Sequence, residues 1–537
     1  MGVRDLLFVG LILGGAAALG ASLYPPRLDD QSKSSNPGPI SDKSLVEVVR
    51  KVDEDFQERW SQEGLSPSRR ASELLVIRRL ALSLTGSIPS LEEIRQIQAT
   101  PVESARAVYL ERLLGDRRFS DYFAERLARS YVGTEGGPFL FFRRHRFVSW
   151  LSDEIAENTP YDVIVRELIS AKGIWTDKPA TNFITVTYDS EKKAFDAERL
   201  AGRVSRAFLG ARIDCAQCHD HPFAPWKQKD FLGLAAFFGQ TQKSLTGLCE
   251  MPVEFTPTDR KTNTPVKVAP QVPFSPELLP PEAHGDRRER LAQWVTHPGN
   301  RAFPRAIVNR VWALMFGRPL VEPIDDLSAA DEIPESLDVI ADDFATHGYN
   351  LRRLIRIIAA TEVFQCESAS DTTPTENQEK AWAIFPLTRL RPEQVVGSVL
   401  QSARLETIDT NSHIFVRLGK YFGESKFIER FGDSGEDEFN TRGGTIPQRL
   451  LMMNGEIVRE RTKPDLFNAG SRVGWFAPTD EAAVEVAYLT LLSRKPTAEE
   501  SRHFIAKLKG TKGDARGERM SDLFWTLVNA TEFSWNH

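Results

Sequence analysis

The chain has 537 residues, of which 41% are hydrophobic and 26% are charged, and its formal net charge is −6. This length implies more than one domain, and the apolar content is sufficient for sizeable hydrophobic cores. Basic residues are spread among acidic ones, so the chain lacks the electrostatic signature of a nucleic-acid-binding protein. We therefore expect no nucleic-acid partner.

An apolar segment lies at the N-terminus, where no charged residue occurs between Asp5 and Arg27. Its Leu-, Gly- and Ala-rich part, residues 6–23, is long enough to span a bilayer and also has the character of a long signal-peptide core. Residues 1–24 are predicted to be a transmembrane anchor or a signal peptide, and the anchor is favoured. In both cases the folded part is exported, as a single-pass membrane protein or, after cleavage, as a secreted one.

The next segment, residues 25–44, is rich in Pro, Ser, Asp and Asn and predicts a flexible linker. From residue 45 to 245, apolar residues recur at three- and four-residue intervals, which predicts a helical module. One apolar stripe ends at Gly86, and Ser90 with Glu93 forms a capping-box pattern at the next helix start. The best strand candidate is 182–188. Further helices are expected over residues 122–132, 147–155, 161–169 and 197–209.

A proline-rich segment interrupts the helical pattern over residues 246–285, with prolines at positions 270, 273, 276, 280 and 281. It predicts a connector between two modules. Helical periodicity then returns over residues 286–537, including 306–316, 337–344, 351–360 and 481–492. The expected fold class is therefore mainly α, with two helical modules joined by a Pro-rich connector and minor β structure.

The pattern Cys-x-x-Cys-His occurs once, at Cys215, Cys218 and His219. In c-type cytochromes, the two thiols of this pattern attach covalently to haem and the adjacent His ligates the iron. The two intervening residues place both sulfurs at one edge of a porphyrin, and the next residue places an imidazole beneath the metal. The pattern predicts a haem c site held by these three residues.

Other interpretations of the same residues stay open. A zinc site would use Cys215, Cys218, His219 and His221, although adjacent ligands strain a tetrahedral site. A Cys215–Cys218 disulfide would be a redox pair or a structural staple. His221 is either a second metal ligand, together with His219, or a residue that hydrogen-bonds its own turn.

Two further cysteines, Cys249 and Cys366, lie far from this pattern in the sequence. An exported chain permits disulfides. The sequence does not decide whether these two thiols pair with each other.

Longer stretches around the pattern resemble a known family. Residues 215–223, 226–231 and 234–238 resemble the second planctomycete cytochrome-like domain, as do residues 78–86 with Ile88-Pro89. Residues 308–312, 316–318, 445–448 and 527–533 resemble planctomycete-specific domain one. Both are domains of unknown function. The cytochrome-like name of the first implies a haem role for the Cys-x-x-Cys-His pattern.

Together, the pattern, the predicted export and the resemblance lead to a functional hypothesis. The chain is expected to be a membrane-tethered c-type haem protein for electron transfer or haem-dependent oxidation at the cell envelope, with an envelope redox or protein partner. The alternative is a non-haem envelope binding or scaffold protein with structural zinc or a disulfide at the Cys/His cluster. The sequence holds no P-loop, nucleophile elbow or Rossmann fingerprint, so it offers no support for a common hydrolase or nucleotide enzyme.

Overall fold

The computed structural model describes residues 42–134, 142–222, 224–258, 263–330, 332–369, 374–409, 412, 427–432, 439, 444–465 and 467–537. They belong to one compact unit, Asp42–His537. The predicted anchor or signal peptide, residues 1–24, lies outside the described residues, as does nearly all of the predicted linker 25–44. Among the described segments, no helix is long and apolar enough to cross a membrane.

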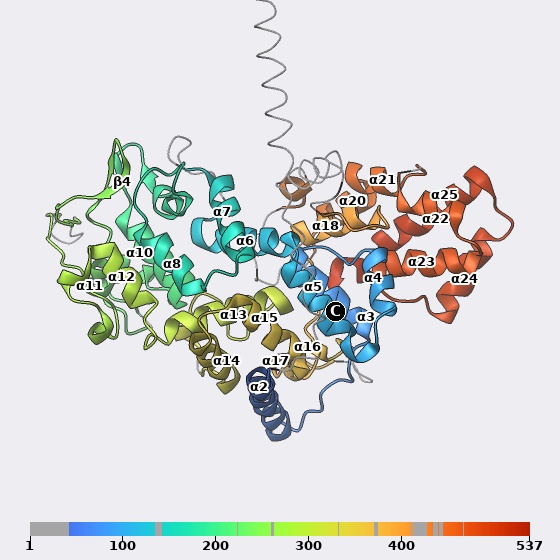
Figure 1. Cartoon of the computed structure of the whole chain (residues 1–537), viewed down its shortest axis with the longest axis horizontal. Helices are drawn as coiled ribbons and strands as arrows, with labels where there is room; N and C mark the ends of the chain where they lie inside the picture. The colour runs from blue at the N-terminus through green and yellow to red at the C-terminus, as the bar shows by residue number, and fades with distance from the viewer. Residues whose placement is uncertain are drawn as a thin grey trace, which may run out of the picture. The chain divides into compact units, whose positions relative to one another are not determined.

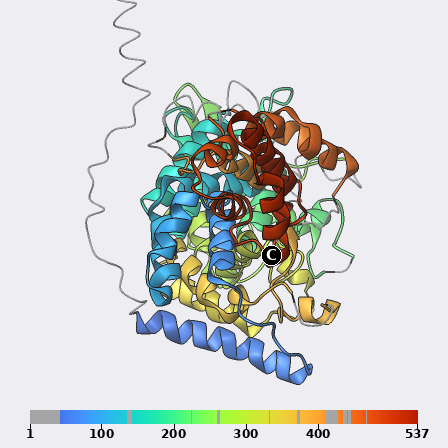
Figure 2. The same cartoon turned by 90° about the vertical axis from the view of Figure 1, so that its right-hand side faces the viewer.

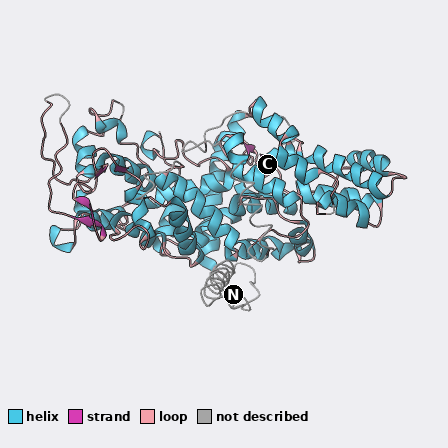
Figure 3. Ribbon diagram, turned by 90° about the horizontal axis from the view of Figure 1, so that it is seen from above, coloured by secondary structure: helices cyan, strands magenta, loops and turns pink. Residues whose placement is uncertain are grey.

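The predicted mainly helical fold is confirmed, and Figure 3 shows helices throughout with only short strands. The first half of the unit contains α2 (Lys43–Gln62), α3 (Glu73–Thr85), α4 (Leu91–Gln98), α5 (Val102–Gly115), α6 (Arg117–Val132), α7 (Arg144–Ala156), α8 (Tyr161–Ser170), α9 (Asn182–Thr185), α10 (Ala197–Leu209) and α11 (Gln228–Ala235).

The second half is also helical. It contains α12 (Arg287–Val295), α13 (Ala302–Phe316), α14 (Glu335–Thr346), α15 (Leu351–Ala360), α16 (Glu362–Gln365), α17 (Glu376–Lys380), α18 (Pro392–Ser402), α20 (Ile446–Asn454), α21 (Glu456–Thr462), α22 (Ala469–Phe476), α23 (Asp480–Leu492), α24 (Ala498–Leu508) and α25 (Gly513–Val528).

Strands form three antiparallel pairs among the described residues. The pair β3 (Thr241–Ser244) and β4 (Gly247–Glu250) is the longest, and β4 lies inside the predicted connector 246–285. The pair β5 (Thr388–Arg389) and β6 (Trp535–Asn536) joins segments far apart in the sequence. The third pair is β1 (Tyr188–Asp189) with β2 (Ala194–Phe195).

The strand predicted at 182–188 is wrong over most of its length, because Asn182–Thr185 form α9 and only Tyr188 begins a strand. The Asn182 side chain explains the helical turn. Its amide nitrogen donates to the carbonyl oxygens of Trp175 (3.0 Å) and Pro179 (2.8 Å), and its oxygen accepts from the Arg143 amide (2.7 Å). These bonds wind the chain into a helical turn, which overrides the β propensity of the Thr and Val residues.

The two predicted modules share one hydrophobic core. A single cluster of buried residues begins at Leu45 and continues through α13, α14 and α15 to Phe385. Figure 2 shows α2 along one edge of the unit, where it packs on α14 and α15. A second cluster joins Leu82 and Ile88 to the C-terminal helices α18 to α25. The module boundaries at 245 and 286 stay predictions from sequence.

Helix α3 is the element that links the two clusters, and its C-terminal end lies at the predicted glycine. Ser72 caps its first turn and Gly86 ends it in the left-handed region with φ +66°. The guanidinium of Arg78 is buried and donates to the carbonyl oxygens of Leu491 (3.0 Å) and Phe533 (3.2 Å). Arg79 donates to the His537 backbone oxygen over 2.8 Å, which places the C-terminus against α3 (Figure 1).

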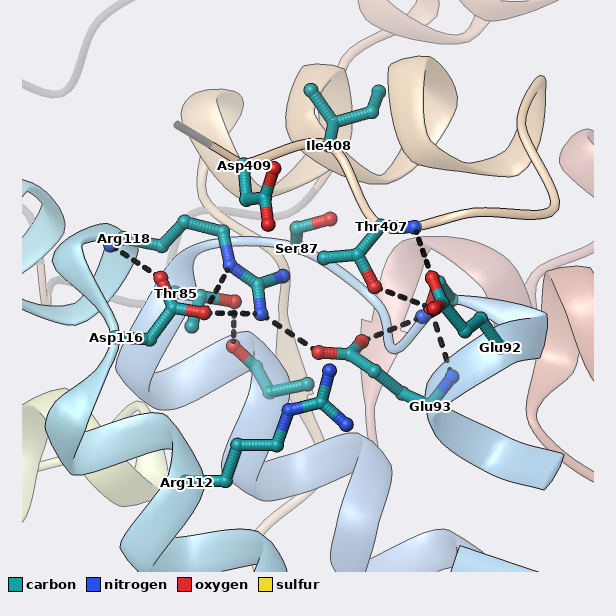
Figure 4. A network of polar contacts seen from close by, with 12 residues as sticks. Thr85, Ser87, Glu92, Glu93, Arg112, Asp116, Arg118, Thr407, Ile408 and Asp409 are labelled. Atoms are coloured by element: carbon teal, nitrogen blue, oxygen red, sulfur yellow. Dashed lines mark hydrogen bonds and ion pairs between the residues drawn. The ribbon is translucent and has the colours of Figure 1, made fainter. Parts of the chain in front are cut away.

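The start of α4 carries the predicted capping box. The Glu93 carboxylate accepts from the Ser90 amide (2.9 Å), and the Ser90 hydroxyl accepts from the Glu93 amide (3.0 Å). Figure 4 shows the other oxygen of Glu93 bound by Arg118, which also binds Asp116. Thr407 donates its amide to Glu92 (3.1 Å) and thereby holds the segment after α18 against α4. The ion pairs of Arg118 with Glu93 and Asp116 thus hold the start of α4 against the start of α6.

Candidate functional site

Cys215 and the residues around it form a surface turn between α10 and α11, two helices that pack on each other (Figure 1). Helix α10 ends at Gly210, whose φ of +55° lies in the left-handed region. The 3₁₀ turn η2 (Asp214–Gln217) follows and contains the first cysteine. Ala216 is buried against the core, whereas Cys215, Cys218 and His219 are exposed. The turn therefore presents the three predicted haem-binding residues to solvent.

Helix α10 holds the start of this turn through Asp214. The Asp214 carboxylate accepts a hydrogen bond from the Arg206 guanidinium over 2.6 Å. It also lies directly over Gly202, where an added Cβ would overlap a carboxylate oxygen. Gln217 at the other end of η2 donates to the Glu198 carboxylate, also on α10. Both ends of η2 are therefore held by side-chain contacts with one helix.

A loop from the second half of the chain also supports the turn. The amide of Leu327 donates to the Gly210 carbonyl over 2.7 Å. The Arg212 guanidinium forms an ion pair with Asp325, with a shortest distance of 2.7 Å. The approach to the motif is thus held by residues more than a hundred positions later in the chain.

His219 has the hydrogen bond expected of an iron ligand. Its Nδ1 lies 2.7 Å from the carbonyl oxygen of Asp220. A carbonyl oxygen only accepts, so Nδ1 carries the proton and Nε2 keeps its lone pair. Metal-binding histidines commonly donate their second ring nitrogen to a carbonyl in this way. The exposed Nε2 side of His219 is therefore chemically prepared to bind a metal.

Asp220 itself does not orient the imidazole with its carboxylate. That carboxylate accepts from the Gln228 amide over 2.9 Å, at the first residue of α11. The backbone carbonyl of Asp220 has the orienting role instead.

His221 has the opposite arrangement. Its Nδ1 accepts a hydrogen bond from the amide of Ala224 over 2.9 Å, and its own amide donates to the carbonyl of Trp226 over 2.8 Å. In the neutral ring the proton therefore sits on Nε2, and neither nitrogen offers a lone pair outward. These bonds fit the role of a residue that holds the turn, and they leave His219 as the better metal ligand.

All four cysteines are present as thiols. Cys215 and Cys218 are exposed, Cys249 is half-buried and Cys366 is buried. Burial raises the pKa of the Cys366 thiol to about 11, so this group is chemically inert near neutral pH. Cys215 and Cys218 therefore differ from Cys366 in being open to reaction partners.

A metal site made by side chains alone would need at least three of them around one point. The described residues contain no group of three or more His, Cys, Asp or Glu side chains placed to hold a metal ion. The four predicted zinc ligands, all described, are therefore not gathered. Haem attachment does not require such a group, since the thiols bond to the porphyrin edge and only the imidazole reaches the iron.

Trp226, which follows the turn in the sequence, packs in a cluster of aromatic side chains. The ring of Trp226 contacts that of Phe274, with ring centroids 6.3 Å apart, and Phe274 contacts Trp294. The buried indole N–H of Trp226 has no acceptor within the described part of the chain.

Sequence reasoning found the motif but missed the residues that hold it. Gly202 and Asp214 meet only in three dimensions. Asp325 is one of two adjacent aspartates in the sequence, a pattern that does not identify its partner. Its contact with Arg212 crosses more than a hundred residues and could not be inferred from spacing.

Two family models match the chain. Residues 51–243 match the family model PSCyt2, described as a protein of unknown function (DUF1549). Residues 287–417 match PSD1, also described as a protein of unknown function (DUF1553). These matches confirm the resemblance noted from the sequence. Searches of the curated proteins and of the solved structures gave no match.

Proposed function

We propose that this chain is an extracytoplasmic c-type haem protein. It belongs to the PSCyt2 family over residues 51–243 and to the PSD1 family over residues 287–417. Cys215 and Cys218 would form the thioether bonds and His219 would be the axial iron ligand. The observation that carries the proposal is the hydrogen bond from His219 Nδ1 to the Asp220 carbonyl, next to two exposed thiols on one turn.

The residues of the turn have separate tasks in this proposal. The two thiols would bond to the edge of the macrocycle, and the Asp220 carbonyl would set the orientation of the His219 ring. Asp214 and Gln217, both bound to α10, hold the turn in one conformation. Bound haem would supply one-electron redox chemistry.

The same proposal includes the location and the partner. Thioether attachment takes place outside the bacterial cytoplasmic membrane, which agrees with the apolar N-terminal segment predicted from the sequence. A tether of this kind would keep the folded part at the membrane surface, where an envelope redox protein is the expected partner. Exposure of the motif suits electron exchange, because it leaves the attachment edge of the macrocycle at the protein surface.

The test is expression of the full chain, exported, in a host that carries cytochrome c maturation machinery. A pyridine haemochrome spectrum and haem staining of a denaturing gel should show covalent haem. Cys215→Ala and Cys218→Ala should each lose one thioether, and the double variant should lose the stained band. Cys249→Ala is the matched control, because this half-buried thiol lies outside the motif and should retain full staining.

Absence of staining in a host that matures a control cytochrome would reject the haem proposal. Elemental analysis of the same sample would then separate the alternatives. One zinc per chain would select a non-haem envelope protein with a structural metal. No metal, with a Cys215–Cys218 disulfide found by mass spectrometry, would select a scaffold protein stapled at the turn.

A further inference from the structure

A cavity of about 220 Å³ lies between α18, α20, α21 and the helical residues 427–431, away from the Cys-x-x-Cys-His turn. Five apolar side chains form its walls: Leu400, Phe427, Leu451, Ile457 and Val458. This volume is smaller than the roughly 300–1,000 Å³ of pockets for drug-sized ligands, so the cavity suits a small molecule.

Positive charge gathers at one side of this apolar cavity. Arg430 and Arg461 line it, and Arg404 lies close enough for its charge to act on Arg461. Burial, followed by the charge of Arg404, lowers the pKa of Arg461. Arg404 and Arg461 therefore repel each other next to a low-dielectric surface, and an anion bound at Arg461 would offset that repulsion.

These arginines differ from most others in the protein. Arginines such as Arg305, Arg353 and Arg494 form close ion pairs with carboxylates. In the described part of the chain, Arg404, Arg430 and Arg461 form no ion pair or side-chain hydrogen bond. A half-buried guanidinium without a partner is an available anion-binding group.

Two carboxylates, Glu456 and Glu460, also line the cavity, but among the described residues neither forms an ion pair with a lining arginine. The Glu460 carboxylate forms an ion pair with Lys463, and that pair adds no net charge. Glu456 is exposed at the mouth of the cavity and has no ion pair with an arginine of the described residues. The cavity therefore combines apolar walls with two arginines that form no ion pair with the carboxylates beside them in the described part of the chain.

We propose that this cavity binds a small amphiphilic anion, whose short alkyl tail lies on the apolar walls and whose carboxylate or phosphate head is bound by Arg461 and Arg430, the two arginines that line it. The apolar side chains exclude a bare inorganic anion as the preferred ligand, and the arginines disfavour a neutral alkyl ligand. This activity is independent of haem binding, because the cavity and the motif share no residue.

Isothermal titration calorimetry of the full chain tests the proposal with four probes. Octanoate and octyl phosphate have both an anionic head group and an alkyl tail. Acetate has only the charge, and octanol has only the tail. We expect the two octyl anions to bind at least about tenfold more tightly than either single-feature probe. The tighter of the two octyl anions identifies the head group.

Variants assign the binding to the cavity. Arg461→Gln should weaken octanoate binding about tenfold or more, since a charge-assisted hydrogen bond is lost. Ile457→Phe should weaken it by filling the cavity, without removing a charge. Arg459→Gln is the matched control, because Arg459 is exposed on the same helix and does not line the cavity. It should change the dissociation constant by less than about twofold.

Thermal unfolding of each variant shows that the fold is intact, and three results would overturn the proposal. They are no binding of either octyl anion, equal binding of octanol and octanoate, and unchanged binding in both Arg461→Gln and Ile457→Phe.

Discussion

The Asp214 carboxylate lies directly over the Cα of Gly202, so the Cys-x-x-Cys-His turn sits on a helix position that has no room for a side chain. Gly202 is a buried helical residue with ordinary helical dihedrals, so its role is close approach and not backbone freedom. The ion pair between Asp214 and Arg206 depends on this approach, and so does the placement of Cys215.

Gly202→Ala should therefore displace the turn. Helix propensity alone would make this change stabilising by about 1 kcal/mol, but the overlap with Asp214 opposes it. We expect the fraction of chains with covalent haem to fall severalfold while the helical circular dichroism spectrum is retained. Gly115→Ala is the matched control, because an added Cβ there meets no atom within 4 Å. Full haem loading in Gly202→Ala would show that the turn tolerates the shift.

The two histidines should respond differently to substitution. His219→Ala removes the nitrogen whose lone pair faces outward, so the thioethers should still form but the ferrous spectrum should differ from that of the wild type. His221→Gln keeps a side-chain acceptor for the Ala224 amide and should retain the wild-type spectrum. Visible spectra of the ferrous proteins, normalised to haem stain, make the comparison. A wild-type spectrum in His219→Ala would assign the axial ligand elsewhere.

The sequence was sufficient for features that depend on local pattern. The end of α3 at Gly86, the capping box of Ser90 and Glu93, and the motif itself were all predictable, because each depends on residues within one or two turns. The helix at Asn182 was not predictable. Its conformation depends on hydrogen bonds to Arg143 and Trp175, which override a β-like composition.

The contacts that hold the Cys-x-x-Cys-His turn could not be predicted from the sequence for the same reason. The contact of Gly202 with Asp214 and the pairing of Arg212 with Asp325 are products of tertiary packing. The tautomers of His219 and His221 also follow from backbone groups whose positions only the fold defines.

A buried ion cluster between α6 and α18 should dominate acid sensitivity. Glu393 accepts from Arg126 over 2.7 Å and from Arg391 over 3.1 Å. Burial alone would raise the pKa of Glu393, but the charges of Arg126 and Arg391 outweigh it and hold the pKa below the ordinary value. The stability from Glu393 is therefore present above the unfolded pKa and is lost as pH falls through the lowered folded value.

Glu393→Gln should lower the free energy of unfolding by about 3–5 kcal/mol at neutral pH, because it leaves buried arginine charge without a carboxylate. Urea unfolding at pH 7 measures the loss, and the difference from the wild type should shrink in acid. Glu63→Gln is the control, because Glu63 is exposed. A decrease in the free energy of unfolding below about 1 kcal/mol would show that the Glu393 ion pairs are screened by solvent and contribute little.

The stability contributed by Asp53 should change with pH in the opposite direction to that of Glu393. Burial raises its pKa from 3.8 to about 6, although its carboxylate accepts from the Glu362 amide over 2.7 Å. The folded protein therefore holds a proton that the unfolded chain releases near pH 4. The contribution of Asp53 to stability is full below the unfolded pKa and is lost as pH rises through about 6.

Asp53→Asn should consequently stabilise the protein above pH 6. Asn cannot ionise, and its side-chain oxygen still accepts from the Glu362 amide. We expect a gain of about 1–2 kcal/mol at pH 7.5, after allowing for partial solvent screening, and convergence with the wild type toward pH 4. Urea unfolding across this pH range measures the difference, with exposed Asp177→Asn as the control. A gain that is independent of pH would show that Asp53 is ionised at no cost and that burial at this position has another effect.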